Sequence, residues 1–486
     1  MKQITDLGIT KPTRPIRVVQ FGEGNFLRAF VDWMIDILNE KTDFDGSIAI
    51  VKPISYGSLD KFEQQDCLYT VILRGRENGE VVNTHRIITS VAKAVDGADT
   101  WAHLAELAQC PTVRFVVSNT TEAGIVLDEG DTMDGVPATY PGKLTKFLYE
   151  RYKAFDGAAD KGVILLPVEL IENNGGKLKD CVLRLARVWN LPEGFAAWLR
   201  QSCIFCSTLV DRIVTGYPAA EAQGLWDALG YRDDLLDVGE PFGLWVIESD
   251  RDVSEELPFA AVGLPVVFTD NQKPYRERKV RILNGAHTSS VLAGWLYGNR
   301  IVRDMMKDSV MGTFVRKAVL EEIAPLVPLD KADVDAFASA VFERFENPFI
   351  DHELLAISLN SVSKWKARVL PSLRDQYAAD GTLPKLLTFS FAALLAFYTS
   401  ADLRDDGLHA ARPDGTPYTI RDDRAVLEFF AKTSGLPTAE YVDAACAQTA
   451  FWGEDLRCYQ GFVPAVTACL DALRGDVQGA VKAILS

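Results

Sequence analysis

Three polar residues with catalytic side chains stand close together in the second half of the chain: Lys279, Asn284 and His287. On an α-helix that turns about 100° per residue, they project within one arc of roughly 140°. Reduction of a ketone needs a proton donor for the carbonyl oxygen and hydrogen-bond donors for the developing alkoxide, and this set contains both. The solvated start of a basic helix has the same spacing, so both interpretations remain open.

Lys279 can serve as the proton donor and acceptor only if its surroundings favour a readily formed neutral amine. Desolvation in a pocket would act in that direction. The cationic neighbours Arg276, Arg278 and Arg281 would do the same.

The start of the chain has the order strand, glycine turn and helix, because the apolar run 16–21 is followed by Gly22, Gly24 and a segment of helical periodicity. In dinucleotide-binding proteins the first glycine permits a tight turn, and the second lets the backbone approach a pyrophosphate at the helix N-terminus. Leu27 replaces the third glycine, so we expect the helix to stand slightly farther from the strand. An ordinary strand-to-helix turn is the alternative. The candidate cofactor contacts here are Phe21, Gly22, Gly24, Asn25 and Phe26.

Three further segments carry polar residues that could line a site. Ser118, Asn119 and Thr120 follow a predicted strand and could face the nicotinamide part of a cofactor, with a capping turn as the alternative. Asn174 lies in an Asn-Asn-Gly sequence that is otherwise typical of a turn. Asp211 precedes an arginine within an apolar run, where a structural salt bridge is the simpler explanation.

Composition limits the class of protein. The chain has 486 residues, 48% of them hydrophobic, which suits two packed domains. A net charge of −16 argues against non-specific binding to nucleic acid or anionic membranes, so an anionic substrate would need a locally basic pocket. We find no signal-peptide pattern, and the longest apolar run, 386–398, is too short to span a bilayer and is better interpreted as a buried helix. The eight cysteines favour reduced thiols and a cytoplasmic location, and the Cys203/Cys206 pair is better explained as core residues than as a zinc or redox site.

The pattern of elements predicts an α/β N-terminal domain followed by a mainly α-helical C-terminal domain. Short β-branched or aliphatic runs alternate with helical segments in the first half, which favours a Rossmann-like, mostly parallel sheet covered on both faces. The predicted strands are 16–21, 47–51, 113–118, 163–167 and 264–269, with 69–74 and 81–88 as an inserted or edge hairpin. We place the domain boundary between residues 275 and 276, so that residues 1–275 bind the dinucleotide and residues 276–486 carry the substrate and catalytic groups.

Taken together, these segments resemble the polyol-specific long-chain dehydrogenase/reductase family, to which mannitol dehydrogenase belongs. The family pattern of Lys, four residues, Asn, two residues and His matches Lys279, Asn284 and His287, and its Val-Asp-Arg-Ile signature matches residues 210–213. The resemblance covers nearly the whole chain. Within the family, the segments 20–33, 118–125, 207–218 and 273–279 look most like the members that reduce keto-uronates.

The resemblance implies a function for individual residues. Lys279 would be the general acid/base, while Asn174 and Asn284 would donate hydrogen bonds to the carbonyl or alkoxide oxygen. His287 would orient substrate hydroxyls and Asp211 would bind another hydroxyl. Members of this type use no metal.

The activity that the resemblance implies is the reversible, NADH-dependent reduction of D-tagaturonate to D-altronate in hexuronate breakdown. Reduction of D-fructuronate to D-mannonate is the nearest alternative, followed by a mannitol-type polyol dehydrogenase. A non-catalytic dinucleotide or sugar-acid sensor is an alternative of another class. The complete set of Lys279, Asn284, His287 and Asn174 favours an enzyme, because a sensor would not need all four.

The chain departs from the polyol members at two places. Lys52 stands where those members have an acidic residue for the adenosine ribose, and it could tolerate a 2′-phosphate. We expect NAD (NADH), with NADP still open. Ala356 stands where those members have an arginine, whereas Lys364 and Arg368 lie four residues apart on one helical face and could bind a substrate carboxylate. A solvated basic face is the alternative for this pair.

Overall fold

The computed structural model of the protein describes residues 1–121 and 123–486. The chain divides into two compact units. Unit 1 comprises Met1–Arg74 and Val81–Gln272, and unit 2 comprises Gly75–Glu80 and Lys273–Ser486. The second unit thus begins at Lys273, close to the boundary expected at residue 276, and it also includes a short segment from the first half of the chain.

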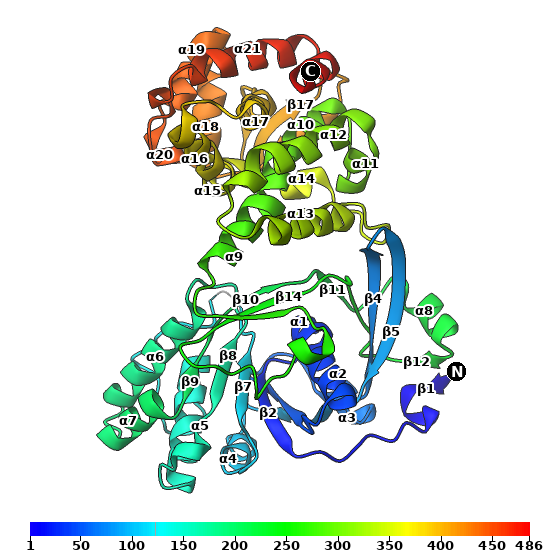
Figure 1. The fold of residues 1–486 in the computed structure, drawn as a ribbon, viewed down its shortest axis with the longest axis vertical. Coiled ribbons are helices and arrows are strands. Elements are labelled where there is room, and N and C mark those ends of the chain that lie inside the picture. Colours follow the sequence, from blue (N-terminus) through cyan, green and yellow to red (C-terminus); the bar gives the residue numbers. More distant parts are fainter. Residues whose placement is uncertain (122) are drawn as a thin grey trace. The chain divides into compact units, whose positions relative to one another are not determined.

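A six-stranded parallel sheet forms the centre of unit 1 (Figure 1). Its order is β6-β3-β2-β7-β8-β9, and every neighbouring pair is parallel. The strands are β2 (Ile16–Phe21), β3 (Ser47–Lys52), β6 (Val91–Asp96), β7 (Phe115–Ser118), β8 (Ile164–Pro167) and β9 (Ile204–Phe205). Chain order runs outward from β2 in both directions, which is the doubly wound arrangement with a switch point between β2 and β7. The predicted Rossmann-like domain is confirmed.

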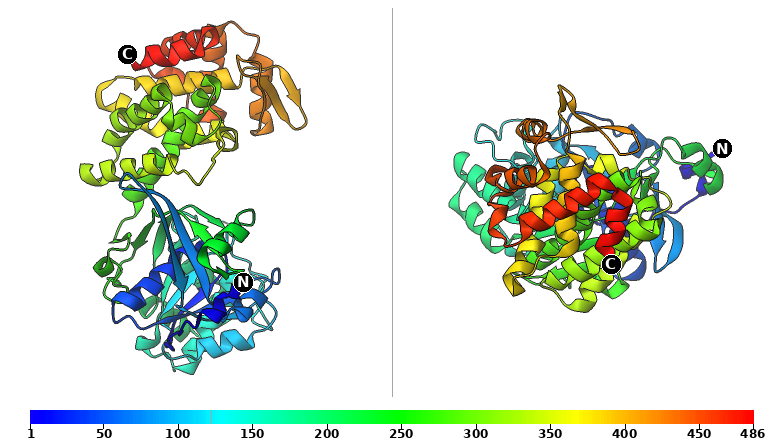
Figure 2. Two further views of the ribbon diagram at one scale, coloured as in Figure 1. Left: turned by 90° about the vertical axis from the view of Figure 1, so that its right-hand side faces the viewer. Right: turned by 90° about the horizontal axis from the view of Figure 1, so that it is seen from above.

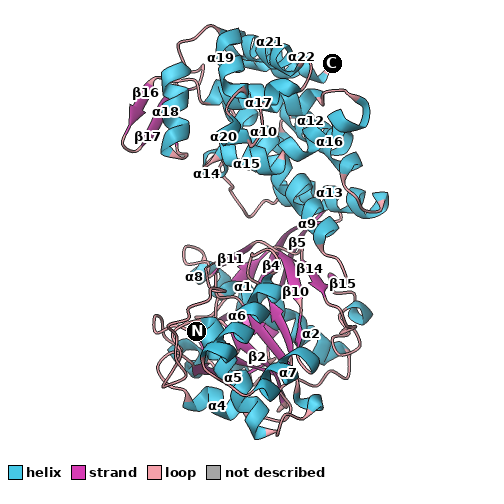
Figure 3. Cartoon of the chain, turned by 90° about the vertical axis from the view of Figure 1, so that its left-hand side faces the viewer, coloured by secondary structure: helices cyan, strands magenta, loops and turns pink. Residues whose placement is uncertain are grey.

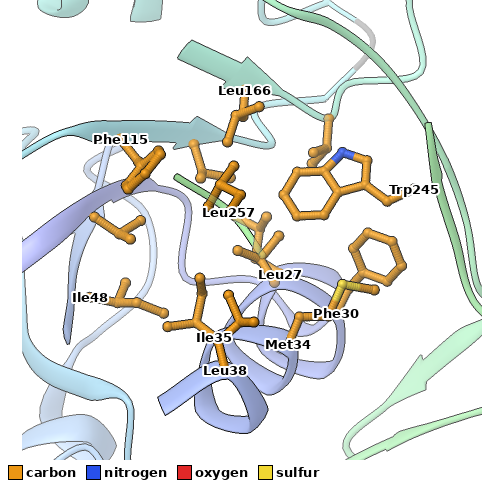
Figure 4. Close-up of a cluster of buried hydrophobic side chains, with 14 of the residues drawn as sticks. Leu27, Phe30, Met34, Ile35, Leu38, Ile48, Phe115, Leu166, Trp245 and Leu257 are labelled. Carbon is orange, nitrogen blue, oxygen red and sulfur yellow. The ribbon is translucent and has the colours of Figure 1, made fainter. Parts of the chain in front are cut away.

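Apolar clusters cover both faces of this sheet, because successive strand residues point to opposite sides. Val18 belongs to one cluster and Val19 to the other. Figure 4 shows the first cluster, where Phe30, Met34 and Leu38 pack toward the strands. Cys203 and Cys206 are buried in the two clusters, as core residues. The helices of unit 1 are α1 (Asn25–Leu27), α2 (Trp33–Lys41), α3 (Asp60–Gln64), α4 (Ala102–Ala108), α5 (Tyr140–Ala154), α6 (Asn174–Val188), α7 (Glu193–Gln201) and α8 (Ala222–Leu229), with a π-helical segment at Arg28–Asp32 and short 3₁₀ turns at Ile4–Leu7, Ala159–Lys161 and Ala260–Val262.

Three smaller sheets complete the strands of the first half. The predicted hairpin is present as β4 (Tyr69–Glu77) and β5 (Glu80–Ile88), with β5 at the edge of a four-stranded sheet. The other strands of that sheet are β11 (Val214–Gly216) and β13 (Asp237–Gly239). A three-stranded sheet contains β10 (Ser207–Asp211), β14 (Leu244–Glu248) and β15 (Val266–Thr269), and β1 (Lys2–Gln3) pairs with β12 (Tyr231–Arg232).

Unit 2 is mainly helical, as predicted (Figure 3). Its helices are α9 (Lys273–Arg278), α10 (Gly285–Tyr297), α11 (Val302–Lys307), α12 (Ser309–Lys317), α13 (Lys331–Phe345), α14 (Leu354–Ile357), α15 (Ser361–Arg368), α16 (Leu370–Asp380), α17 (Lys385–Phe397), α18 (Arg424–Thr433), α19 (Thr438–Cys446), α20 (Thr449–Trp452), α21 (Phe462–Gly475) and α22 (Val477–Leu485). π-Helical segments span Lys279–Asn284 and Ala318–Ile323, and 3₁₀ turns span Ala324–Leu326 and Leu456–Cys458. The strands β16 (Asp402–Arg404), β17 (Gly407–Ala411) and β18 (Pro417–Ile420) form a small antiparallel sheet beside these helices (orange in Figure 2, left).

The helix α17 contains the longest apolar run of the chain and packs against α10 and α21 within unit 2. It is a buried core helix, as the sequence predicted. Among the described residues, no helix combines the length and apolar character that a membrane span requires.

Candidate functional site

The turn after β2 requires glycine at its first position. Gly22 has a φ angle of +128°, and a Cβ atom there would lie 3.1 Å from Leu27 Cδ1 and 3.2 Å from the Asn119 carbonyl oxygen. The Gly22 N–H donates to the Val51 carbonyl at 2.9 Å, which ties the turn to β3. Leu27, in place of a third glycine, is 1% exposed and belongs to the apolar core. The hydrogen bond to Val51 and the close contacts with Leu27 and Asn119 therefore fix the conformation of this turn.

A cavity of about 480 Å³ opens at this turn, at the carboxyl ends of β2, β3 and β7. Parallel doubly wound sheets bind ligands at this edge, next to the switch point. The Gly24 backbone borders open space, since no atom lies within 4 Å of the position of an added Cβ. The lining residues are Gly22, Glu23, Gly24, Pro53, Ile54, Asn119, Thr120, Thr121, Ala123, Gly124, Val126, Ala138, Thr139 and Tyr140.

The predicted cofactor contacts divide into two groups. Gly22, Gly24, Asn119 and Thr120 line the cavity, whereas Phe21, Asn25, Phe26, Lys52 and Ser118 are not among its lining residues. Phe21 is a core residue, because it is buried and its ring lies 5.2 Å from that of Tyr140. Phe26 stacks on Phe30, and the exposed Asn25 side chain accepts a hydrogen bond from Arg28.

Glu169 holds the segment after β7 in place, although the sequence did not single it out. This carboxylate is 1% exposed. It accepts hydrogen bonds from Ser118 Oγ at 3.1 Å, from Thr120 Oγ1 at 2.9 Å and from the Thr120 N–H at 3.0 Å. Burial raises the pKa of Glu169 and outweighs these hydrogen bonds, which act in the opposite direction. Glu122, in the middle of the predicted 118–124 segment, lies outside the described residues.

The Lys52 ammonium group is occupied by other protein groups. Its side chain is 4% exposed, and its Nζ atom lies 3.1 Å from Asp96 Oδ2 and donates to the Ile54 carbonyl at 2.7 Å. A lysine tied in this way has little freedom to reach a 2′-phosphate in the cavity.

Asn174 is fully buried, and its amide is engaged with backbone groups. Its Nδ2 atom donates to the carbonyl oxygens of Pro167, Glu169 and Thr208, each at 3.0 Å. Its Oδ1 atom accepts from the N–H groups of Gly175 and Thr208. These contacts hold the turn after β8 against β10, which favours a positioning function for Asn174 over the direct substrate contact expected from the sequence.

Asp211 lies at the end of β10 and is 6% exposed. The neighbouring Arg212 donates to the backbone carbonyls of Phe242, Ala29 and Pro241, and its guanidinium lies 4.6 Å from the centre of the Trp33 ring. Arg212 thus connects separate backbone segments within unit 1.

Lys279 and Asn284 are the first and last residues of a π-helical segment, and not part of the regular α-helix that the sequence analysis assumed. In a π-helix each N–H bonds to the carbonyl five residues earlier, so residues five apart come nearly into line along the axis. On an α-helix they would be separated by about 140°. The local structure therefore brings the side chains of Lys279 and Asn284 onto more nearly the same face. Both are half-buried.

His287 lies three residues further, in α10, within a group of positive side chains. Its ring stacks on Phe345 with centroids 4.1 Å apart, and His352 meets it edge-on at 5.5 Å. Burial lowers the pKa of His287 well below its usual value, and the charges of His352, Arg344, Arg368 and Lys364 add to this effect. The imidazole is therefore neutral near pH 7. Its Nε2 atom is buried and has no hydrogen-bond partner among the described residues.

Lys364 and Arg368 lie one turn apart on α15, as the sequence predicted. Lys364 Nζ donates to the Ile357 carbonyl at 2.9 Å, and Arg368 Nη1 lies 3.5 Å from Thr288 Oγ1 of α10. Burial lowers the pKa of both groups, and Arg368 lowers that of Lys364 further while Asp422 opposes the shift. Over residues 1–121 and 123–486, no carboxylate forms an ion pair with either head group within 4.0 Å. Arg344, Lys364 and Arg368 form, around the imidazoles of His287 and His352, what we call the cationic cluster of unit 2.

Several residues of the two sites were missed by the sequence analysis. Glu23 stands inside the Gly-x-Gly turn, and its place there could have drawn attention to it. His352 and Arg344 gave no such signal, because they come from a loop and from α13, and only packing brings them to His287. Within the described part of the chain, no three side chains of His, Cys, Asp or Glu gather in an arrangement suited to a metal ion.

Two models of one protein family match the chain. The Mannitol dehydrogenase Rossmann domain matches residues 16–260, and the Mannitol dehydrogenase C-terminal domain matches residues 271–474.

Curated relatives match over most of their length. Altronate oxidoreductase of Bacillus subtilis (strain 168) is 44% identical over 446 residues, covering 91% of this chain and 89% of the relative. Altronate oxidoreductase of Shigella flexneri is 45% identical over 467 residues, covering 94% of each chain.

Solved structures share the fold. Mannitol 2-dehydrogenase of Pseudomonas fluorescens, in a ternary complex with NAD and D-mannitol, superposes with a TM-score of 0.67 at 24% identity, covering 100% of this chain and 96% of that one. Substrate-free D-sorbitol dehydrogenase gives a TM-score of 0.75 at 21% identity, covering 97% and 95%.

The surroundings of His287 predict an unusual titration. The chain has five histidines, so the imidazole signals of histidine-labelled protein can be resolved by NMR and assigned to His287 by their loss in His287→Asn. We expect the midpoint of this signal to lie well below that of an ordinary histidine, because burial and positive neighbours disfavour the imidazolium. A His287 midpoint near the ordinary value of about 6.5 would contradict the described environment.

Proposed function

Because the chain belongs to the mannitol dehydrogenase family, we propose that it interconverts D-tagaturonate and D-altronate, with NADH or NAD as the hydride carrier. The relatives named altronate oxidoreductase support this activity. The structural observation that carries the proposal is the cationic cluster around His287. A keto-uronate brings a carboxylate to such a cluster, whereas a plain polyol does not.

In this proposal Lys364 and Arg368 bind the substrate carboxylate. Both head groups are partly removed from water without forming an ion pair with a carboxylate, which is costly unless an anion joins them. An arginine can hold a carboxylate through two parallel hydrogen bonds, and a lysine adds a point charge. The pair thus selects for a sugar acid over a neutral sugar.

The cavity of unit 1 suits a dinucleotide, because the required glycine at position 22 and the open backbone at Gly24 leave room beside the start of a helix. The bound cofactor supplies a hydride to the keto carbon. We propose that residues 1–275 hold it, while the proton donor and the groups for the sugar acid come from residues 276–486.

We propose that Lys279 is the general acid/base. When hydride reaches the keto carbon, the carbonyl oxygen becomes an alkoxide, and Lys279 Nζ gives it a proton. The amine then regains a proton from solvent. In the oxidative direction the neutral amine takes the hydroxyl proton.

Asn284 and His287 would act beside the lysine. The Asn284 amide, nearly in line with Lys279 along the π-helical segment, donates a hydrogen bond to the developing alkoxide. The neutral imidazole of His287 can accept from one substrate hydroxyl and donate to another, and its buried Nε2 atom needs such a partner. Binding of a hydroxyl to Asp211 stays a prediction from the family pattern, and Asn174 would position the loop after β8.

Substrate preference tests the proposed activity. Purified protein would be given NADH with D-tagaturonate, D-fructuronate or fructose, and kcat/KM would be obtained from the loss of NADH absorbance. We expect D-tagaturonate to be preferred by about a hundredfold, or roughly 3 kcal/mol of transition-state stabilisation. A preference for D-fructuronate would move the protein to the sister activity, and absence of turnover with all three would support a sensor.

Replacement of Lys279 tests the proton transfer. We expect Lys279→Ala to lower kcat by about 10²- to 10⁴-fold, because the alkoxide loses its proton donor, while NADH binding is unchanged. Lys307→Ala, at an exposed lysine of α11, is the matched control and should keep wild-type turnover. If Lys279→Ala turned over substrate at nearly the wild-type rate, the assignment of the general acid would be wrong.

Replacement of Arg368 tests carboxylate recognition. We expect Arg368→Ala to raise KM for the keto-uronate by roughly 10- to 100-fold, because one charge-assisted hydrogen-bonded contact is lost. Turnover of fructose, which has no carboxylate, should not fall. Arg374→Ala removes an exposed arginine of α16 and serves as the control. An unchanged KM in Arg368→Ala would refute this function for Arg368.

A further inference from the structure

Strand β3 ends at Lys52, where a doubly wound domain that prefers NAD carries an acidic residue for the adenosine ribose. A free basic side chain at this position would favour NADP, because it could bind the additional 2′-phosphate. The surroundings of Lys52 decide whether its charge is available.

The positive charge of Lys52 is already compensated within the protein. Asp96, at the end of β6, lies 3.1 Å from its Nζ atom. Burial opposes ionisation of Asp96, but hydrogen bonds from the N–H groups of Asp99 and Ala98 and from Lys52 outweigh it, so its pKa lies below the usual value. Asp96 therefore stays ionised at neutral pH and neutralises Lys52.

Glu23 brings a further carboxylate to this end of the cavity. It lines the cavity together with Pro53 and Ile54, the two residues that follow Lys52. Burial raises the pKa of Glu23, the charges of Lys52 and Arg28 lower it, and the charge of Asp96 raises it. The half-buried Glu23 side chain is thus close to the position from which the usual acidic residue is missing.

We propose that Glu23 takes the place of that residue: its carboxylate accepts hydrogen bonds from the adenosine ribose hydroxyls and makes the protein selective for NAD(H) over NADP(H). Asp96 balances Lys52, and Arg28 lies 3.7 Å from Asp237, so a 2′-phosphate at this end of the cavity would meet the Glu23 carboxylate. A 2′-phosphate would bring about −1.5 to −2 further charges and would be repelled. This inference rests on the proposed function, because it assumes that the cavity of unit 1 holds the dinucleotide.

The test is direct binding of NADH and of NADPH to the full chain, measured by calorimetry without substrate. We expect the wild type to bind NADH more tightly. In Glu23→Gln, which keeps the size of the side chain, NADH binding should weaken about 10-fold and NADPH binding should strengthen by a similar factor. Glu63→Gln, at an exposed glutamate of α3, is the matched control and should bind like the wild type. In the double variant Lys52→Met/Asp96→Asn, which removes the ammonium and the carboxylate together, NADPH binding should not weaken, because the two charges already neutralise each other.

Three results would overturn the inference. An unchanged NADH/NADPH affinity ratio in Glu23→Gln would show that Glu23 does not bind the ribose hydroxyls, while leaving the proposed activity intact. Weaker NADPH binding in Lys52→Met/Asp96→Asn would assign phosphate recognition to the lysine. If the wild type bound neither dinucleotide, the proposed function and this inference would both fail. An unchanged affinity ratio in Glu23→Gln, in contrast, would overturn only this inference.

Discussion

The close approach of two strands at Gly22 is the constraint on which the first unit depends. Parallel strands put all their carboxyl ends at one edge, and β2 must leave that edge by a turn that fits between Val51 on one side and Asn119 on the other. A side chain at Gly22 would press on Leu27 Cδ1 and the Asn119 carbonyl oxygen and would need a φ angle that L-residues rarely take. Gly22 is also one of the residues that line the cavity.

Buried positive charge is the corresponding feature of the second unit. The chain as a whole carries a net charge of −16, yet around His287 the nearby charges are positive. Desolvating Lys364 and Arg368 is unfavourable, so their burial opposes folding unless an anion binds there. It also keeps His287 neutral, which leaves the imidazole able to both donate and accept a hydrogen bond. The same buried positive groups thus account for the local charge and for the ability of His287 to donate and accept hydrogen bonds.

Departures from regular helix geometry place the candidate catalytic groups. The π-helical segment Lys279–Asn284 contains one residue more per hydrogen-bonded turn than an α-helix, and this changes which side chains share a face. A second π-helical segment, Arg28–Asp32, follows the glycine turn of the first unit. Such segments are less stable than α-helix and occur frequently at functional sites, which fits their position beside both candidate sites.

The order of elements follows from the sequence alone, because it depends on local periodicity. The apolar runs that became β2, β3, β7 and β8, the hairpin of β4 and β5 and the buried helix α17 were all predicted, with small errors at the ends of the elements. The family pattern likewise identified Lys279, Asn284 and His287 as a set, and the spacing of Lys364 and Arg368 placed them on one face of a helix.

Tertiary structure alone decided the partners of these residues, because partners distant in sequence meet only through packing. Lys52 looked available for a phosphate until Asp96 and the Ile54 carbonyl were found to hold it. Asn174 looked free to bind substrate, but three backbone carbonyls accept from its buried amide. No local pattern predicts which charges a fold desolvates together. Periodicity in the sequence therefore determined the helices and strands. The burial of polar groups in the folded protein decided which polar side chains remain available to a ligand.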